Sequence, residues 1–184
     1  MSSIFRLRHA AYRLHEGGVV AYPTEAIYGL GCDPLNRRAV ARLLDIKQRP
    51  ISKGLILIAA SFEQLIPFVR PVPGAQMQAV LESWPGPNTW LLPAAGSTPH
   101  WLTGGRDSIA VRVTAHPLAA GLCRAFGGAI VSTSANLSGY PPAKTALEVR
   151  LRCPGTDVIL HGSTGGSTRP TTIRNALSGT VIRP

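Results

Sequence analysis

The chain has 184 residues, 45% of them hydrophobic and 6% aromatic, with 19 glycines and 16 prolines. This length and composition favour one soluble globular domain with many tight turns, and they argue against disorder and against a second full domain. Lys and Arg outnumber Asp and Glu by 19 to 9, which gives a formal net charge of +10. Such a charge points to phosphate-bearing partners such as nucleic acid, with a merely solvated basic surface as the alternative.

Cysteine usage and apolar runs limit the environment of the chain. Cys32, Cys123 and Cys153 lie far apart, without the spacing of a zinc site or a disulfide framework. We expect them to be buried free thiols in a reducing cytoplasm. No stretch reaches the roughly 18 apolar residues of a membrane span, and residues 1–18 lack the apolar core of a secretion signal. No membrane association is expected.

The N-terminal third predicts helices and strands in alternation. An amphipathic helix is expected over residues 4–16, with a buried stripe of Ile4, Leu7, Ala11 and Leu14. The apolar run 19–23 predicts a buried strand that leads into the polar segment TEAIYGLG. Asn36 is expected to cap a helix through residue 48, which stops near Arg49 because Pro50 disfavours helical geometry before it.

The middle of the chain continues this alternation. Its predicted elements are a buried strand over 54–60, a short helix with Ser61 and Gln64 as a capping box, a helix over 75–84, and strands over 89–94 and 108–113. Residues 95–107 have loop composition. In the strand 108–113 three apolar residues share one face and Arg112 projects from the other, so this charged side chain needs a partner.

The C-terminal part completes an α/β pattern. Its predicted elements are a helix over 117–126, a strand over 129–133, a helix from Thr145 to about 152 with Glu148 completing a capping box, a strand over 157–161, and a hairpin over 171–184 around Ser178-Gly179. Strands that alternate with helices predict one α/β domain over residues 1–184 with a parallel or mixed sheet. Ligands of such sheets usually gather beyond strand ends.

Basic residues cluster at the exit of the second predicted helix. Lys47, Arg49 and Lys53 can surround a polyphosphate, and a solvated basic turn is the alternative. The chain lacks both a P-loop and a dinucleotide-binding glycine fingerprint. No nucleophilic triad or metal cage is indicated, and His116 is expected to be a structural or capping group. Any Mg²⁺ is expected to arrive with substrate phosphates.

The segment STSAN, residues 132–136, gathers short polar side chains after a predicted strand. Ser and Thr hydroxyls suit the binding of oxyanions and amides at close range, because each both donates and accepts. A turn with a helix cap explains the same residues equally well. If the chain stays extended, positions 132, 134 and 136 lie on one side of it.

Six segments in a fixed order carry a resemblance that none of them carries alone. They read YPTEAIYGLG, KQRP, PGPNT, SIAVRVTAHP, STSANLSG and RPTTIR. In order and spelling they resemble the YrdC family, the threonylcarbamoyl-AMP synthases, from about residue 15 to the C-terminus. The most specific part is the combination of KxR, which is Lys47 and Arg49, with SxN, which is Ser134 and Asn136. The length resembles the short, single-domain bacterial form.

The resemblance implies a fold and a reaction. The fold is a single-domain, twisted, open mixed α/β sheet with flanking helices and a basic concave face. The reaction converts L-threonine, bicarbonate and ATP into L-threonylcarbamoyl-AMP and pyrophosphate, for N6-threonylcarbamoyladenosine at position 37 of ANN-reading tRNAs. The protein's share would be positioning and charge neutralisation.

The resemblance also implies roles for individual residues. Lys47 and Arg49 are expected to be catalytic, at the ATP phosphates and the forming carbamate. The ATP-binding set implied is Arg49, Lys53, Ser108, Ser134, Asn136 and Arg183. Arg112 is expected to hold the threonine carboxylate, and the threonine contacts implied beside it are Thr24, Ser132 and Thr171. No protein metal ligand is implied.

Two positions depart from the family pattern. Ala26 stands where the family commonly has threonine, so a hydroxyl contact to substrate is absent. Near the C-terminus the usual Pro-Ser-Thr is Pro170-Thr171-Thr172, which keeps a hydroxyl at the threonine-contacting position and adds a methyl group. We expect the activity to survive both changes.

The implied partners extend beyond the small substrates. Because the product is labile, the resemblance implies contact with tRNA and a functional hand-off to the tRNA threonylcarbamoyl transferase complex (TsaD, TsaB and TsaE). The net charge of +10 keeps a second hypothesis open, namely a double-stranded RNA or tRNA-binding module that acts in tRNA or rRNA maturation. The two hypotheses are compatible.

Overall fold

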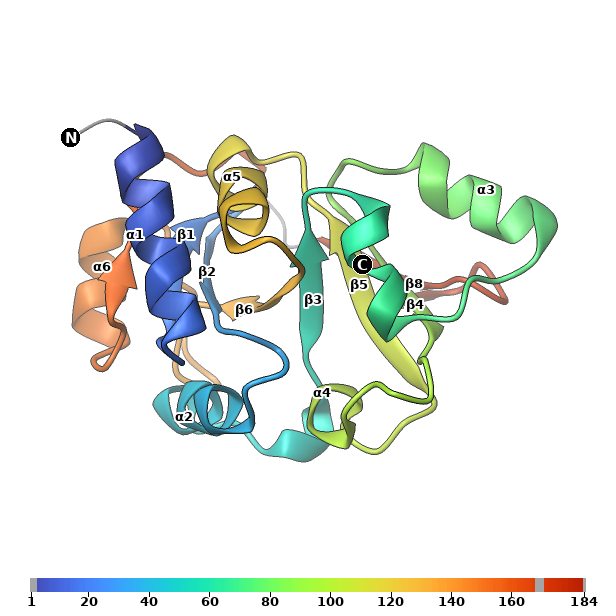
Figure 1. The fold of residues 1–184 in the computed structure, drawn as a ribbon, viewed down its shortest axis with the longest axis horizontal. Coiled ribbons are helices and arrows are strands. Elements are labelled where there is room, and N and C mark those ends of the chain that lie inside the picture. Colours follow the sequence, from blue (N-terminus) through green and yellow to red (C-terminus); the bar gives the residue numbers. More distant parts are fainter. Residues whose placement is uncertain (1–2, 168–170, 184) are drawn as a thin grey trace.

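A nine-stranded sheet runs through the described residues, which are 3–167 and 171–183 of this computed structural model (Figure 1). Its strands are β1 (Val20–Pro23), β2 (Tyr28–Gly31), β3 (Ile56–Ala59), β4 (Asn88–Pro93), β5 (Ser108–Val113), β6 (Ile130–Ser134), β7 (Val158–Ile159), β8 (Thr172–Asn175) and β9 (Val181–Arg183). The α-helices are α1 (Ser3–His15), α2 (Arg37–Lys47), α3 (Gly74–Glu82), α4 (His100–Thr103), α5 (Pro117–Phe126) and α6 (Ala146–Arg152). Short 3-10 helices span Ile51–Lys53, Phe62–Gln64 and Ile66–Phe68.

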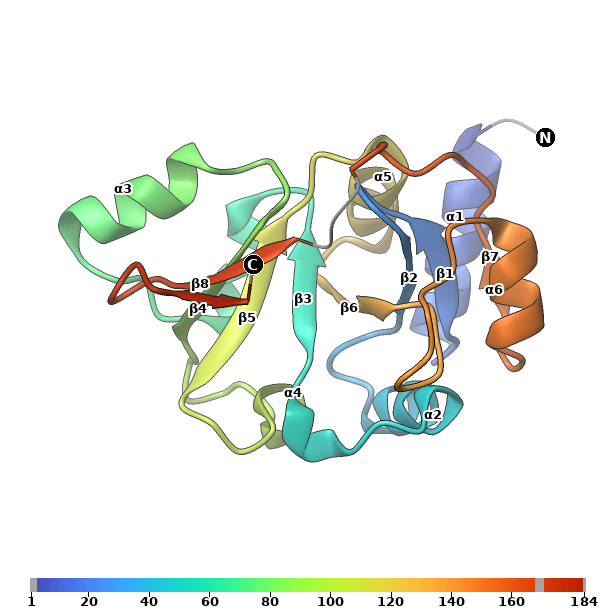
Figure 2. The same cartoon turned by 180° about the vertical axis from the view of Figure 1, so that it is seen from behind.

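The sheet mixes parallel and antiparallel neighbours in the order β7-β1-β2-β6-β3-β5-β4-β8-β9. The pairs β1–β7, β3–β5 and β4–β8 are parallel, and the other neighbours are antiparallel. The sheet stays open, with β7 and β9 as its edges (Figure 2). This architecture confirms the expected twisted, open mixed sheet with flanking helices. The sheet also joins segments that are distant in the sequence, because β6 lies between β2 and β3.

One face of the sheet carries the larger hydrophobic core. Leu57, Val111 and Val131 belong to this core and lie in register on the neighbouring strands β3, β5 and β6. Helix α2 contributes Leu43 and α4 contributes Leu102 to the same cluster. Alternation along each strand therefore sends the intervening residues to the opposite face.

The opposite face is covered by helices at one end only. Ile58 and Ile130 pack there in a second apolar cluster with residues of α1 and α5, which lie side by side (Figure 1). Arg112 pairs in register with Ile58, and Ser132 pairs with Ile56. Both polar side chains therefore share this face with the second cluster, and the candidate site forms beside it.

Local sequence signals fix the two capped helices as expected. The Asn36 side chain accepts hydrogen bonds from the backbone N–H groups of Arg38 and Ala39 at the start of α2. Thr145 and Glu148 form the predicted capping box of α6. Helix α2 ends at Gln48, a non-glycine residue with the left-handed φ of 49°. The chain turns there, just before the predicted stop near Arg49.

Several expectations about local structure were wrong. Ile4 is 64% exposed, and Ala10 takes its place in the buried stripe of α1. Ser61 makes no capping hydrogen bond, and Gln64 instead accepts one from the Ala60 N–H, so this segment is a 3-10 turn. The loop expected over 95–107 contains the short helix α4.

Strand β2 was also not predicted, because two glycines in TEAIYGLG obscure it. A Cβ atom at Gly31 would clash with the Val131 carbonyl oxygen and would lie 2.9 Å from the Tyr22 ring. The absence of a side chain thus allows β2 to fit between β1 and β6, where it pairs with both.

The cysteines agree with their expected state. Cys32, Cys123 and Cys153 are free and buried, and burial raises the pKa of each thiol. Among the described helices, none combines the length and apolar character needed to cross a lipid bilayer.

Candidate functional site

A cavity of about 210 Å³ opens where the loops after β1 and α2 meet strands β3, β5 and β6. Its lining residues are Thr24, Ala26, Ile27, Tyr28, Gly29, Arg49, Gly54, Leu55, Ile56, Arg112, Ser132, Thr133, Ser134, Pro142, Thr171 and Arg183. They come from segments that are far apart in the sequence. The topology therefore gathers the polar clusters that the sequence placed after strands and helices.

Seven of the expected substrate-binding residues line this cavity, namely Thr24, Arg49, Arg112, Ser132, Ser134, Thr171 and Arg183. Lys47, Lys53, Ser108 and Asn136 lie outside its lining. Lys53 is exposed beside the lining residue Gly54, and Ser108 lies at the start of β5, paired with Pro93. The Arg169-Pro170 part of RPTTIR lies outside the described residues.

Three guanidinium groups make the cavity strongly basic. Arg49 donates to the Gly54 carbonyl at 3.1 Å, and Arg183 donates to the Thr171 carbonyl at 3.2 Å. Burial lowers the pKa of Arg49, and the charge of Arg183 lowers it further. Burial likewise lowers the pKa of Arg183, and the charge of Arg112 lowers it further. Since no acidic side chain occurs among the described lining residues, the cavity favours a ligand with several negative charges.

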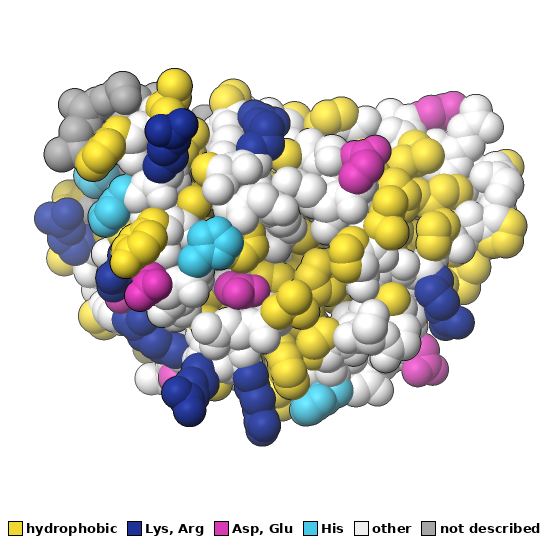
Figure 3. Space-filling model, viewed as in Figure 1, with side chains coloured by type: hydrophobic (Ala, Val, Ile, Leu, Met, Phe, Trp, Pro, Cys, Tyr) yellow, Lys and Arg dark blue, Asp and Glu magenta, His cyan; other side chains and the backbone are white. Residues whose placement is uncertain are grey.

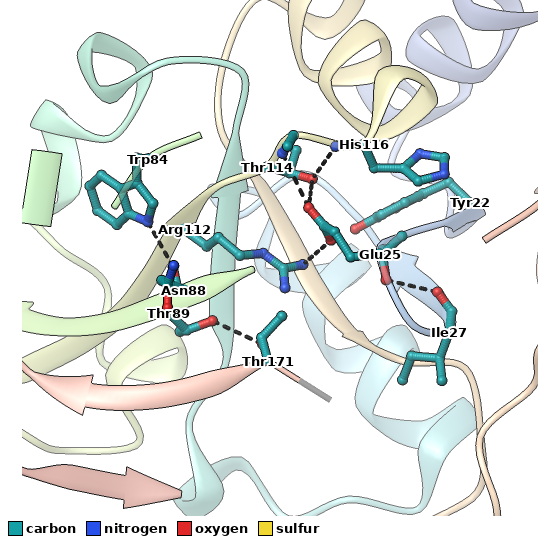
Figure 4. Close-up of polar contacts among 12 residues, drawn as sticks. Tyr22, Glu25, Ile27, Trp84, Asn88, Thr89, Arg112, Thr114, His116 and Thr171 are labelled. Atoms are coloured by element: carbon teal, nitrogen blue, oxygen red, sulfur yellow. Dashed lines mark hydrogen bonds and ion pairs between the residues drawn. The ribbon is translucent and has the colours of Figure 1, made fainter. Parts of the chain in front are cut away.

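Arg112 has the partner that its place in the middle of β5 requires (Figure 4). Its Nη2 atom lies 3.6 Å from Oε2 of Glu25, and both side chains are nearly buried. The other Glu25 oxygen, Oε1, accepts hydrogen bonds from the Thr114 hydroxyl at 2.7 Å and the Ala115 N–H at 3.1 Å. The sequence indicated the need for a partner but gave no sign that Glu25 supplies it.

Lys47 is placed differently from Arg49, although both belong to KxR. Its ammonium group donates to the carbonyl of Ser134, to the Asn136 carbonyl at 2.9 Å and to the Asn136 side-chain oxygen at 3.1 Å. The Lys47 carbonyl accepts from the Ser138 N–H at 2.9 Å. Lys47 thus holds the segment after β6 from both its side chain and its backbone.

The environment of Lys47 corrects its expected place on a polar helix exit. The residue is 2% exposed, and its ammonium group contacts protein oxygens. Burial and the charge of Arg49 lower the pKa of Lys47 to about 8. Removing this side chain would leave buried carbonyl groups without a donor, so a substitution there would alter structure as well as chemistry.

The STSAN segment divides its polar groups between the cavity and its own turn. Ser132 and Ser134 line the cavity, but Asn136 does not, because β6 ends at Ser134 and the alternation stops there. The Ser134 hydroxyl donates to the Asn136 side-chain oxygen at 2.5 Å, and the Asn136 amide donates to the Tyr140 carbonyl at 2.7 Å. The extended chain that the expectation for positions 132, 134 and 136 required therefore ends at Ser134, although the side chains of Ser134 and Asn136 remain in contact.

The threonine side chains of the cavity are held by neighbours. The Thr24 hydroxyl donates to the Ile27 carbonyl at 2.7 Å, and the hydroxyl groups of Thr171 and Thr89 lie 3.1 Å apart (Figure 4). Ala26 lines the cavity with a methyl group, where the family pattern has a hydroxyl. His116 occupies the N-cap position of α5, but its side chain makes no capping hydrogen bond there, and its Nε2 atom lies 3.1 Å from the Ser163 carbonyl.

Comparison with known proteins relates this geometry to a family. Residues 13–184 match the family model Sua5/YciO/YrdC, which is described as telomere recombination. A protein of Alkalilimnicola ehrlichii named threonylcarbamoyl-AMP synthase is 61% identical over 97% of this chain and 95% of its own length. A protein of the same name from Halorhodospira halophila is 58% identical over 97% of this chain and 94% of its own length.

A solved structure agrees with both findings. The crystal structure of P. abyssi Sua5 complexed with L-threonine superposes with a TM-score of 0.92 at 35% sequence identity. It covers 98% of this chain, and this chain spans 54% of that Sua5 chain. With the family match over residues 13–184, these comparisons establish that the chain belongs to the Sua5/YciO/YrdC family.

Proposed function

We propose that the chain is a threonylcarbamoyl-AMP synthase, a nucleotidyltransferase that makes L-threonylcarbamoyl-AMP and pyrophosphate from L-threonine, bicarbonate and ATP. The observation that carries this proposal is one cavity that combines three arginines with hydroxyl groups, in a chain 61% identical to a protein of that name. Both the triphosphate and the carbamate of threonine carry several negative charges, which matches this lining. The product would serve N6-threonylcarbamoyladenosine synthesis at tRNA position 37.

The reaction needs little covalent chemistry from the protein. The uncharged threonine amine attacks carbon dioxide derived from bicarbonate, and loss of a proton leaves a carbamate. A carbamate oxygen then attacks the α-phosphorus of ATP, the bond from that phosphorus to the oxygen bridging it to the β-phosphorus breaks, and pyrophosphate leaves with that oxygen. Positioning of two anions and neutralisation of their charge are the steps that residues of this chain would provide.

Each anion is assigned to a part of the cavity. Arg49 and Arg183 would bind the phosphates and stabilise the leaving pyrophosphate, with Ser134 beside them. Arg112 and Ser132 would bind the threonine carboxylate, and the threonine contacts we assign further are Thr24 and Thr171. Lys53 and Ser108 would contact the part of ATP that extends beyond the cavity. Lys47 and Asn136 would act by shaping the segment that carries Ser134.

Magnesium and location complete the proposal. Among the described residues no group of three or more His, Cys, Asp or Glu side chains is placed to hold a metal ion, so we assign Mg²⁺ to the ATP phosphates. The one continuous sheet supports residues 1–184 as a single domain. We place the protein in the cytoplasm, where its product would be handed to the tRNA threonylcarbamoyl transferase complex (TsaD, TsaB and TsaE).

Pyrophosphate release tests the activity directly. With ATP and Mg²⁺, the purified chain should release pyrophosphate only when threonine and bicarbonate are both present. Arg49→Ala should lower kcat/KM by about 10²–10³-fold, the usual effect of removing a donor to transition-state charge. Arg38→Ala, an exposed arginine of α2 outside the cavity lining, is the matched control and should change little. Absence of release with all substrates present would refute the proposal.

A basic surface supports direct RNA contact as a second function. Arg6 and Arg8 of α1 and Arg37 and Arg38 of α2 are exposed, and Figure 3 shows Lys and Arg side chains over these two helices. We call these four residues the α1–α2 basic surface. It is separate from the cavity lining, so RNA binding and catalysis can be compatible.

A further inference from the structure

Glu25 is the acidic side chain most closely tied to the candidate site, yet it does not line the cavity. It is 8% exposed, and Arg112 beside it is 6% exposed. A buried carboxylate is costly unless hydrogen bonds and an opposite charge compensate it. Burial alone would raise the pKa of Glu25, but Arg112 and the hydrogen bonds from Thr114 and Ala115 outweigh it and lower this pKa. The carboxylate is therefore charged at neutral pH.

The two oxygens of Glu25 have different surroundings. Oε1 is held by the Thr114 hydroxyl and the Ala115 N–H, which follow β5 directly. Oε2 is buried without a hydrogen bond and faces the guanidinium group of Arg112 at 3.6 Å. Figure 4 shows Arg112 reaching from β5 towards this oxygen. Glu25 is thus fixed by one oxygen and directs the other at Arg112.

Arg112 keeps its donors free despite this contact. Its side chain makes no hydrogen bond within the described residues, and its Nε atom is buried without a partner. A guanidinium group offers five N–H donors in a rigid fork that matches a carboxylate with two parallel hydrogen bonds. A charge contact that orients the fork without using its donors suits an arginine that must receive a ligand.

We infer that Glu25 is a positioning residue, which orients the guanidinium fork of Arg112 towards the carboxylate of the amino-acid substrate. The inference rests on the proposed function and deepens it. Glu25 does not touch the ligand itself, because its side chain is absent from the cavity lining. It acts on one substrate only, since Arg49 and Arg183 are held by backbone carbonyls instead.

A purely electrostatic effect of Glu25 on the cavity would change the affinity for the substrate in the opposite direction. If its charge acted only through the field, removing it would make the cavity more positive and tighten the binding of an anion. If it orients Arg112, removing the charge should weaken amino-acid binding. The direction of the change in affinity therefore separates positioning from simple charge balance.

Glu25→Gln tests the inference with the least disturbance. The amide oxygen still accepts from Thr114 and Ala115, while an uncharged NH₂ group faces Arg112. We expect the KM for threonine and the Kd of L-threonine measured by calorimetry to rise about tenfold or more, the loss typical when one partner of a buried charge pair is removed. The KM for ATP should stay within about twofold of wild type.

Two further variants keep the test decisive. Asp157→Asn neutralises a carboxylate 2.7 Å from Arg42, outside the cavity lining, and should leave threonine binding unchanged. Thr114→Val removes one hydrogen bond to Glu25 and should weaken threonine binding in the same direction but less, which provides a test if Glu25→Gln does not fold.

The possible outcomes distinguish the two proposals. Unchanged or tighter threonine binding by folded Glu25→Gln, or by Thr114→Val if that is the folded variant, overturns the inference while the synthase activity stands. An equal rise in the KM values for ATP and threonine also overturns it. If the wild-type chain binds no threonine and releases no pyrophosphate, the proposed function fails, and the inference fails with it.

Discussion

The ammonium group of Lys47 donates to three acceptors in the segment 134–136, and this requires three N–H groups. A neutral amine has only two. Because burial and the charge of Arg49 lower the pKa of Lys47 to about 8, the segment loses one of these donors under mildly alkaline conditions. We expect Ser134, which this segment presents to the cavity, to be held less firmly under these conditions.

Activity should therefore fall as the pH rises above about 8, whereas stability should change in the opposite direction. The pKa of Lys47 in the folded chain lies below its ordinary value of 10.5, so between these values the unfolded chain holds a proton that the folded chain has lost. The contribution of this group to the free energy of unfolding thus increases with pH across that window. The measurements are kcat/KM and urea unfolding from pH 7 to 10.

Lys47→Arg serves as the control for that prediction. A guanidinium group stays charged throughout this range, so the alkaline loss of activity should move to higher pH even if the maximal rate is lower. An identical alkaline limb in the wild type and in Lys47→Arg would assign the titration to another group.

At the scale of elements, α6 fixes a wall of the cavity from outside. Arg152 near its end donates to the carbonyl groups of Pro141 and Pro142, and Pro142 lines the cavity. The start of the helix depends on Thr145, whose hydroxyl accepts from the Glu148 N–H in the capping box. The capped helix thereby supports the loop that follows Asn136.

Thr145→Ala should lower the free energy of unfolding by about 1 kcal/mol, the usual cost of losing an N-cap side chain. Urea unfolding measures this change. Leu147→Ala on the same helix is the control, because Leu147 is 65% exposed and its removal should cost less than about 0.5 kcal/mol. Equal effects of both substitutions would show that the cap contributes nothing specific.

The elements also show which features sequence can predict. The caps at Asn36 and Thr145 follow from neighbours within three residues, and both were predicted. Strand β2 pairs with β6 about one hundred residues later, with Leu30 opposite Thr133, and no local signal encodes this pairing. The Glu25–Arg112 pair is equally non-local. Seven expected site residues line one cavity. They could be predicted because the order and spelling of the motifs, unlike periodicity, carry information about residues that meet only in the folded chain.

At the scale of the whole molecule, the net charge of +10 should appear as salt-dependent RNA binding. For wild-type chain and tRNA, log Kd should rise steeply with log salt concentration. Replacing Arg37 and Arg38 of the α1–α2 basic surface by Ala should reduce the slope by about one for each arginine that contacts phosphate. Filter binding or anisotropy across a salt series measures this.

Two controls accompany the RNA prediction. Arg70→Ala removes an exposed arginine outside that surface and should leave the slope unchanged. Pyrophosphate release by Arg37→Ala/Arg38→Ala should equal that of the wild type, because neither residue lines the cavity. Binding of tRNA that does not depend on salt would contradict the role of this surface.

The position of β6 between β2 and β3 has a consequence for the order of events during folding. The β1–β2 hairpin can form as soon as its residues are available, but the cavity needs β6 to insert beside it. It also needs β8 of the β8–β9 hairpin to pair with β4, because this brings Arg183 of β9 to the cavity. Pairings between such distant segments form slowly. The ability to bind ligand should thus emerge in the last kinetic phase, and on a ribosome only after the final hairpin has left the exit tunnel.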